Sequence, residues 1–259
     1  NKLTYGMYQR ILGNIKNKEF VAGQSDIDKP RRIKDKEEIK LISEAEKIGD
    51  EAFSHILKIL KTGMSERDVA IELESYMKRQ GASGLSFETI AASGLRSAMP
   101  HGTASGKLIG KGDFLTLDFG CVYKGYCSDM TRTVVFGTPD AKQKEVYDLV
   151  LKAQNTALDS IKLGMNCSDV DKLARDVITD GGYGEYFTHS LGHSVGVEIH
   201  ENPVFSPKST DILEDGCVMS VEPGIYIDGW GGVRIEDLIA ICDGEVINLT
   251  HSPKELIVI

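Results

Sequence analysis

Residues 114–136, "FLTLDFGCVYKGYCSDMTRTVVF", decide the fold. Apolar residues on both sides of Lys124 and Gly125 predict two antiparallel strands joined by a tight turn. Asp118 lies on the first strand and Asp129 on the second. Aspartate is depleted in strands, and two facing carboxylates repel each other unless a proton or a cation lies between them. The hairpin therefore predicts a chemical site as well as a sheet.

A second apolar hairpin follows much later in the chain. "GCVMSVEPGIYI" at 216–227 turns at "DGWGG" into "VRIEDLIAIC" at 233–242. This hairpin also carries two acids, Glu222 and Glu236, inside apolar strands. The unusual feature of the first hairpin therefore recurs in the second half.

Alternation of side chains along a strand decides which of them can meet. It places Thr116 on the same face as Asp118, and Arg234 on the same face as Glu236. Four carboxylates that face one cleft cannot all stay ionised without compensation. Two divalent cations would supply that charge, so the pattern predicts a dinuclear metal centre.

The helical part of the chain is also repeated. Residues 51–69 match residues 152–170 at an offset of 101 positions, with a shared Gly-Met and a shared Asp-Val. Helical patterns run over about 35–61 and 65–80, and an apolar strand is predicted near 87–93. Each half follows the order helix, helix, strands. We therefore expect an α+β fold of two pseudo-symmetric halves, with a curved, mostly antiparallel sheet inside and helices outside.

Composition limits the classes of partner and environment. The 259 residues include 30 basic and 39 acidic ones, a net charge of −9, which argues against nucleic acid or an anionic membrane as the main partner. The five cysteines are odd in number and form no C-x-x-C pair, which argues against a disulfide framework or a thiolate zinc site. We expect a cytoplasmic protein without a membrane span.

Four of the six histidines occur in two short segments. His189, His193 and His200 lie in "HSLGHSVGVEIHENP", and His101 lies in "AMPHG". A lone histidine is more often structural, but three within 15 residues are candidates for ligands and proton donors. A site rich in carboxylates and without thiolates suits manganese, cobalt, iron or zinc, with manganese or cobalt favoured.

Five motifs then occur in order between about residue 30 and residue 259. They are "DFG" at 118–120, "GYCSDMTRT" at 125–133, "GHSVGVEIHENP" at 192–203, "VEPGIYI" at 221–227 and "GVRIED" at 232–237. These motifs resemble those of the pita-bread metallopeptidases, a family that includes methionine aminopeptidase, aminopeptidase P and prolidase. The resemblance implies the pita-bread fold and a dinuclear-metal peptidase.

The resemblance implies a ligand set for two divalent ions, most readily Mn²⁺, with Co²⁺, Zn²⁺ or Fe²⁺ as alternatives. Asp129 and Glu236 would bridge both ions, Asp118 would hold one, and His193 with Glu222 would hold the other.

Roles for the remaining residues follow from the same reading. Glu222 is expected to act as general base, and His101 and His200 to donate hydrogen bonds to the substrate and the developing oxyanion. Substrate binding is expected from three further residues, which are His189, Tyr226 and Arg234.

The motifs are similar to those of the proline-specific branch of the family. "SGLRSAMPHG" at 93–102 and the ending "LTHSPKELIVI" resemble that branch, whereas methionine aminopeptidases carry Gln-x-Glu-His around the last ligand. This implies an Xaa-Pro dipeptidase or aminopeptidase acting on short proline-containing peptides. Some prolidases carry an arginine four residues after the histidine that matches His200, and Val204 stands there in this chain.

Full-length members of the family carry a separate N-terminal domain. Residues 1–34 are therefore expected to be the remnant of such a domain and its linker, and residues 35–259 the catalytic domain. We expect a homodimer when the protein is full length. Two alternatives stay open from sequence: a methionine aminopeptidase, and a metal-free pita-bread module used for binding.

Overall fold

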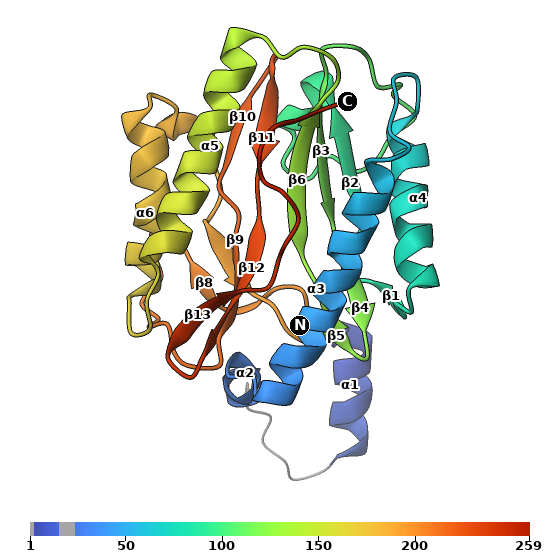
Figure 1. Cartoon of the computed structure of the whole chain (residues 1–259). Helices are drawn as coiled ribbons and strands as arrows, with labels where there is room; N and C mark the ends of the chain where they lie inside the picture. The colour runs from blue at the N-terminus through green and yellow to red at the C-terminus, as the bar shows by residue number, and fades with distance from the viewer. Residues whose placement is uncertain (1–2, 16–23) are drawn as a thin grey trace.

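The two halves of the chain lie side by side, with helices on the outside and strands between them (Figure 1). The computed structural model describes residues 3–15 and 24–259. Within these residues, helices α3 (Lys36–Ile56) and α4 (Glu66–Arg79) flank the first half, and α5 (Ala141–Ser160) and α6 (Cys167–Asp180) flank the second. The predicted order of helix, helix, strands in each half is confirmed.

Local capping fixes where the helices begin. The Ser65 side chain accepts from the backbone N–H of Asp68, and the Asp68 carboxylate accepts from that of Ser65, which is a capping box. Asp35 and Glu38 form the same arrangement at the start of α3. The predicted end of α3 near residue 61 is wrong. The helix ends at Ile56, where the N–H groups of Lys58 and Ile59 donate to carbonyls three residues back and the regular α-helical pattern is lost.

The strands of each half form an antiparallel-rich sheet. In the first half, β3 (Phe114–Phe119) pairs with β6 (Met130–Val135), so that Asp118 lies opposite Thr131. A β-bridge between Thr131 and Glu236 joins the halves, and the backbone N–H of Glu236 donates to the Thr131 carbonyl at 3.0 Å.

The sheet order is β14-β6-β3-β2 in the first half, with strands β14 (Ile257–Val258), β6 (Met130–Val135), β3 (Phe114–Phe119) and β2 (Ile90–Ser93). In the second half it is β13-β12-β9-β7-β8, with β13 (Glu245–Asn248), β12 (Asp237–Cys242), β9 (Val218–Val221), β7 (Gly192–Ser194) and β8 (Glu201–Phe205).

Smaller strand pairs complete the described chain. Strands β10 (Gly224–Ile227) and β11 (Gly231–Arg234) form the tip of the second hairpin. The short 3₁₀ helix η1 (Gly94–Ala98) packs against β11, and η2 (Gly184–Tyr186) follows α6. The first predicted strand is shorter than expected, because β2 begins at Ile90.

The first hairpin is interrupted where the prediction made it continuous. Its tip, β4 (Cys121–Tyr123) and β5 (Tyr126–Cys127), pairs with β1 (Gly84–Leu85) in a separate sheet. Lys124 and Gly125 form the predicted turn with φ of 49° and 91°, as a two-residue hairpin loop requires. At the break, a Cβ on Gly120 would lie 2.0 Å from the Ser128 carbonyl oxygen. Asp129 therefore lies at this break and precedes β6.

Each half has a hydrophobic cluster between its helices and its sheet, and a third cluster joins Ile42 of α3 to Val218 and Leu238 of the second half. In the first half, Phe53 of α3 and Leu73 of α4 pack with Leu117 of β3. In the second half, Val150 of α5 and Ala174 of α6 belong to a cluster that includes strands β9 to β12. The strands are therefore anchored from their helical side.

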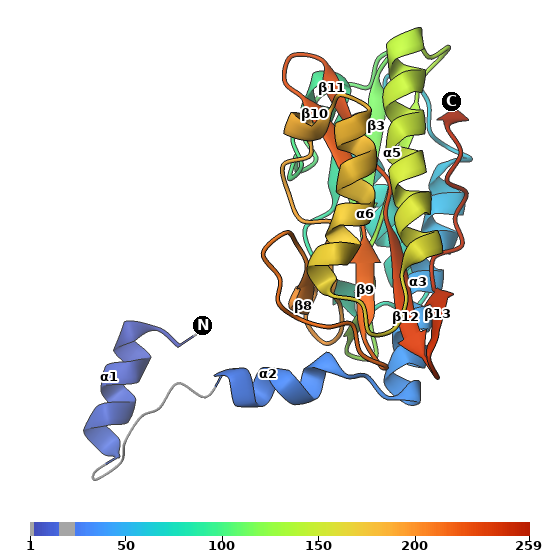
Figure 2. The ribbon, with the colours of Figure 1, turned by 90° about the vertical axis from the view of Figure 1, so that its left-hand side faces the viewer.

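The segment before α3 is not all linker. Helix α1 (Tyr5–Asn14) lies apart from the other described elements, whereas α2 (Gln24–Arg32) contacts β8 (Figure 2). Arg32 forms an ion pair with Asp211 at 2.7 Å, and Lys34 is buried. Residues 1–2 and 16–23 of the expected N-terminal remnant lie outside the described residues, and the division at residue 34 stays a prediction.

The close approach at Gly120 gives a testable consequence. Gly120→Ala should lower the free energy of unfolding by about 1–3 kcal/mol, because the new methyl group has no room beside the Ser128 carbonyl. Urea denaturation measures the change. Gly106→Ala is the matched control, since nothing lies within 4 Å of its added Cβ, and it should be close to neutral. Equal stability of the two variants would contradict the interpretation.

Candidate metal centre

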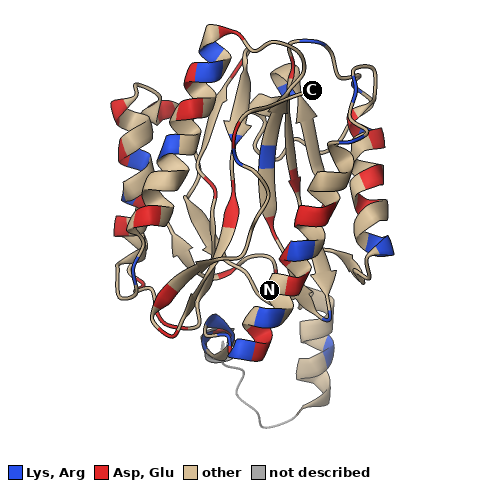
Figure 3. Ribbon diagram, in the orientation of Figure 1, with Lys and Arg blue, Asp and Glu red and all other residues tan. Residues whose placement is uncertain are grey.

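Both halves contribute residues to one cavity of about 630 Å³. Figure 3 shows acidic residues on the central strands as well as on the outer helices. Tyr226 does not line the cavity, but hydrogen-bonds to two residues that do. The other predicted site residues all line it, and they are Asp118, Asp129 and His101 from the first half and His189, His193, His200, Glu222, Arg234 and Glu236 from the second.

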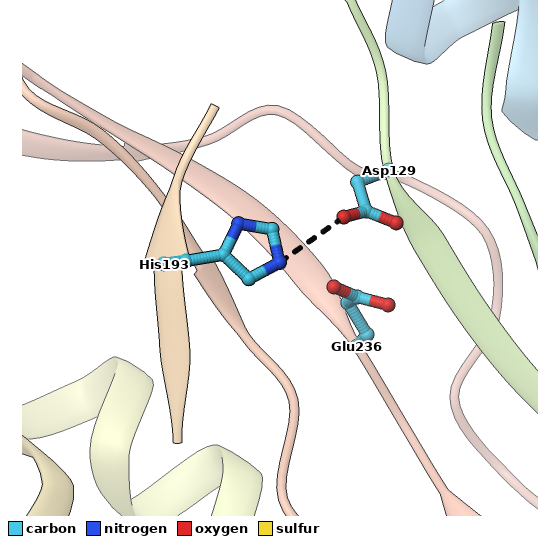
Figure 4. Close-up of side chains that lie close together, drawn as sticks. All are labelled: Asp129, His193 and Glu236. Atoms are coloured by element: carbon cyan, nitrogen blue, oxygen red, sulfur yellow. Dashed lines mark ion pairs between the residues drawn. The ribbon is translucent and has the colours of Figure 1, made fainter. Parts of the chain in front are cut away.

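Three of the five predicted ligands form a compact group. One ligand atom each of Asp129, His193 and Glu236 lies within 4.8 Å of the others. Figure 4 shows the three side chains pointing toward one another, from β7, from the residue before β6 and from the residue before β12. The Nε2 atom of His193 lies 3.6 Å from Oδ2 of Asp129. The group therefore joins the two hairpins, as the sequence predicts.

Glu222 lies beside this group. Its Oε1 atom is 3.4 Å from Nε2 of His193 and accepts a hydrogen bond from the Ser220 hydroxyl at 3.2 Å. Ser220 Oγ also accepts from the backbone N–H of His193. Ser220 thus fixes the relative positions of a predicted ligand from β7 and one that follows β9.

Asp118 differs from the other predicted ligands, because an arginine already occupies one of its carboxylate oxygens. Its Oδ2 atom accepts a hydrogen bond from the Arg234 guanidinium, so one oxygen is taken by an ion pair. Its Oδ1 atom is buried and has no hydrogen-bond partner among the described residues. Oε1 of Glu236 is likewise buried and has no hydrogen-bond partner among the described residues. Two buried carboxylate oxygens therefore remain available for a cation.

The electrostatics of the group favour positive charge. Burial and the neighbouring charge of Glu236 raise the pKa of Asp129 well above its ordinary value, and burial raises the pKa of Glu222 to about 8. Crowded, desolvated carboxylates of this kind are stabilised by protons or by a metal ion. Oxygen and imidazole donors without a thiolate fit a divalent cation such as manganese, cobalt, iron or zinc.

The His193 ring is in the form that a ligand requires. Burial lowers the pKa of His193 to about 4, so the imidazole is neutral near pH 7. Its Nδ1 atom lies 3.2 Å from the Ser194 carbonyl oxygen, which can only accept. The proton therefore resides on Nδ1, and the lone pair of Nε2 faces Asp129 and Glu222.

The predicted substrate-binding residues form a hydrogen-bonded chain. Arg234 donates to the Tyr226 hydroxyl at 2.7 Å, and that hydroxyl lies 2.8 Å from Nε2 of His189. Arg234 is 3% exposed and also donates to Thr131 and Asp118. The guanidinium is therefore committed to the protein, and Tyr226 supports the cavity wall from behind.

The remaining two histidines lie at the cavity in different settings. The His200 ring centre is 4.4 Å from that of His193, in an edge-on arrangement. Partial burial lowers the pKa of His200, which favours the neutral imidazole, and this form can donate one hydrogen bond. His101 is exposed and lies in the segment after η1.

A family model for "Metallopeptidase family M24" matches residues 40–243. The chain belongs to this family. It is 53% identical over 259 residues to an uncharacterized peptidase, YqhT, of Bacillus subtilis, covering all of this chain and 73% of that protein. It is 45% identical over 257 residues to the Xaa-Pro dipeptidase of Pyrococcus horikoshii, covering 99% of this chain and 73% of the relative.

Solved structures of similar proteins lead to the same family. An Xaa-Pro dipeptidase from Bacillus anthracis has a TM-score of 0.96 and 50% identity, covering all of this chain and 72% of that one. Prolidase from Pyrococcus furiosus has a TM-score of 0.92 and 44% identity, with 98% and 75% covered. The expected pita-bread family, its fold and its class as a metal-dependent hydrolase are confirmed. No helix in the described ranges is both long and apolar enough to cross a bilayer.

Sequence reasoning missed two residues that support the predicted ligands. Thr131 donates to Oε2 of Glu236 at 2.6 Å, and Glu46 of α3 accepts from the backbone N–H of Asp129 at 3.1 Å. Thr131 follows Asp129 by two positions in the first hairpin, which is a usable signal. The signal for Glu46 is an acid on the buried face of a helix, beside Ala45 and close to Gly49.

The pKa shifts predict how stability depends on pH. In metal-stripped protein, the free energy of unfolding should fall from about pH 7 to about pH 8.5, because carboxyl groups with raised pKa values bind more protons in the folded than in the unfolded chain there. His189 and His193, whose pKa values are lowered by burial, are neutral in the folded protein over this range. Thermal unfolding at several pH values measures the slope.

Two further measurements test the cause of that slope. Saturating Mn²⁺ should flatten it, because the cation replaces the protons. Glu222→Gln should reduce it in the stripped protein, because one titrating group is removed. A stability that rises with pH in the stripped protein would contradict the assignment of the buried carboxylates.

Proposed function

We propose that this M24 metallopeptidase hydrolyses the bond between an N-terminal residue and proline in dipeptides and short peptides, with two divalent metal ions bound. The observation that carries the proposal is the group of Asp129, His193 and Glu236 on the wall of a substrate-sized cavity. The substrate class is supported by relatives named Xaa-Pro dipeptidase, at 45% identity in two Pyrococcus species.

The geometry supports the ligand assignment made from sequence. Asp129 and Glu236 are the two carboxylates of the compact group, so they are proposed to bridge the ions. Glu222 lies next to His193, so these two are proposed to share one ion. Asp118 would hold the other through its unpaired oxygen, while Arg234 keeps its second oxygen in place. When bound, the ions polarise the scissile carbonyl and lower the pKa of a water molecule.

The chain's own residues supply the proton transfers. Glu222 is proposed to take up the proton of the attacking water and to pass it to the leaving proline nitrogen. Its position fits this role, because Ser220 holds one of its oxygens toward His193. His200 and His101 are proposed to donate to the substrate carbonyl as negative charge develops there.

Selectivity for proline follows from what the cavity offers. The Xaa-Pro amide nitrogen carries no N–H, so a wall without an acceptor at that point admits it and leaves the N–H of an ordinary peptide unpaired. Part of the cavity lining is apolar, including Phe87, Ile90, Ile199 and Val204. His189 is proposed to orient the proline ring, and Tyr226 to hold the His189 ring through their hydrogen bond.

The alternatives drawn from sequence have less support. The relatives named for their substrate in the comparisons above are Xaa-Pro peptidases, which disfavours a methionine aminopeptidase. A metal-free binding module has no physical reason to keep unpaired buried carboxylate oxygens around a neutral histidine. Manganese as the native metal, a cytoplasmic location and a homodimer remain predictions from sequence.

Metal dependence is the direct test. Chelation should abolish cleavage of Ala-Pro, and Mn²⁺ or Co²⁺ should restore it. Glu236→Ala should lose both ions, as measured by elemental analysis of the purified protein, because this carboxylate is proposed to bridge them. Asp228→Ala is the control, since Asp228 is exposed and outside the cavity lining, and it should retain both ions. Full activity after chelation would refute the proposed function.

Substrate length is a second test. Arg234 is the one lysine or arginine lining the cavity in the described part of the chain, and its guanidinium already serves Asp118, Thr131 and Tyr226. Val204 cannot form a charge-assisted hydrogen bond, an interaction of roughly 1.5–3 kcal/mol. The free carboxylate of a dipeptide therefore adds little binding free energy in this cavity. We expect kcat/KM for Ala-Pro-Ala and for Ala-Pro amide to equal or exceed that for Ala-Pro. A strong preference for Ala-Pro would contradict this.

A further inference from the structure

Lys34 is a buried lysine with no place in the site as described so far. It lies between α2 and α3, before the residues matched by the family model, and is 4% exposed. Its ammonium group donates to Ser194 Oγ at 2.9 Å, to Glu201 Oε2 at 3.0 Å and to the Arg32 carbonyl at 3.4 Å. An ammonium group has three N–H donors, and each has a partner here.

The two side-chain partners of Lys34 are sequence neighbours of the cavity histidines. Ser194 follows His193 in β7, and Glu201 follows His200 at the start of β8. Ser194 and Glu201 also lie opposite each other across the β7-β8 pair, at the point where its register shifts. Lys34 therefore ties the two strands together at the irregular end of this pair.

Glu201 fixes the turn between the two strands as well. Its Oε1 atom accepts from the backbone N–H of Glu198 at 3.0 Å and from Arg31. A Cβ on Gly196 would lie 2.6 Å from Oε2 of Glu201 and 2.9 Å from Cε of Lys34. The space between the turn and the ion pair is thus filled, and the backbone that carries His200 has little freedom to move.

The relative placement of the two histidines depends on this backbone. Their rings stand edge-on with centres 4.4 Å apart, and Nδ1 of His193 is directed to the Ser194 carbonyl. A ligand and a transition-state donor on one strand pair must keep their relative position within a fraction of an ångström. Fold stability alone gives a weak reason for Lys34, because replacing a buried ion pair by apolar side chains is often neutral.

We propose that Lys34 is a positioning residue that sets the geometry of His193 and His200 by tying Ser194 and Glu201 together. The proposal rests on the proposed function for the role of His200. It assigns the segment between α2 and α3 a part in the reaction, although no atom of that segment lines the cavity.

The kinetic test uses Lys34→Met, which keeps the length of the side chain and removes its donors. With Ala-Pro and saturating Mn²⁺, kcat should fall roughly 10–100-fold, the range seen when a partner that orients a site residue is lost. KM should change little. Lys36→Met is the matched control: Lys36 lies two residues away, forms an exposed ion pair with Asp243 at 2.7 Å, and should behave as wild type.

A double-mutant cycle separates positioning from general destabilisation. If Lys34 acts through His200, Lys34→Met should lower kcat much less in a His200→Ala background than in the wild type. Independent, additive losses in the two backgrounds would overturn the proposal. An unchanged kcat in Lys34→Met would overturn it as well. If Lys34→Met does not fold, Glu201→Gln replaces it in the cycle with the same expectations.

A spectroscopic readout keeps this result distinct from the proposed function. In protein with diamagnetic Zn²⁺, the ring NMR signals of His193 and His200 should shift in Lys34→Met, while those of His189 should stay in place. Lys36→Met should shift none of them. This outcome does not require turnover, so it still decides the role of Lys34 if Ala-Pro is not cleaved. Unshifted signals of both His193 and His200 would overturn the proposal.

Discussion

The structure depends on holding several negatively charged carboxylates close together at one cavity. Asp129 and Glu236 come from different halves, and such crowding costs free energy unless fixed groups compensate. Part of the compensation comes from the protein, since Thr131 donates to Glu236 and Arg234 donates to Asp118. The oxygens that no donor reaches are the ones left for cations.

A buried charge beside these carboxylates also joins the two halves of the fold. Arg132, only 1% exposed, donates to the Asp237 carboxylate, to the Glu236 carbonyl and to the carbonyls of Ser252 and Pro253. It therefore ties β6 to the start of β12 and to the C-terminal segment. A buried arginine is tolerated only when its N–H groups are satisfied. The contact between the halves and the position of Glu236 in the candidate metal site are thus maintained by one set of bonds.

Charged groups on the outer elements hold the segments that carry the cavity histidines. Glu66 of α4 accepts hydrogen bonds from both ends of the segment that contains His101. Arg175 of α6 donates to the carbonyl of His189 at 2.8 Å. Lys34 serves the strand pair of the other two histidines. The five predicted ligands thus lie on strands or directly beside their ends, while charged groups outside the sheets position the less regular backbone.

The sequence by itself determined most of the elements, the family motifs and most of the side chains that face the cavity. Short-range rules decide these features: the capping box at Ser65, the turn at Lys124, and the alternation that puts Arg234 on the face of Glu236. Only the tertiary structure decided that Arg234 pairs with Asp118, that the first hairpin breaks at Gly120, and that Lys34 reaches Ser194 across 160 positions. These contacts depend on how distant segments pack, and no local periodicity or propensity encodes the distance between them.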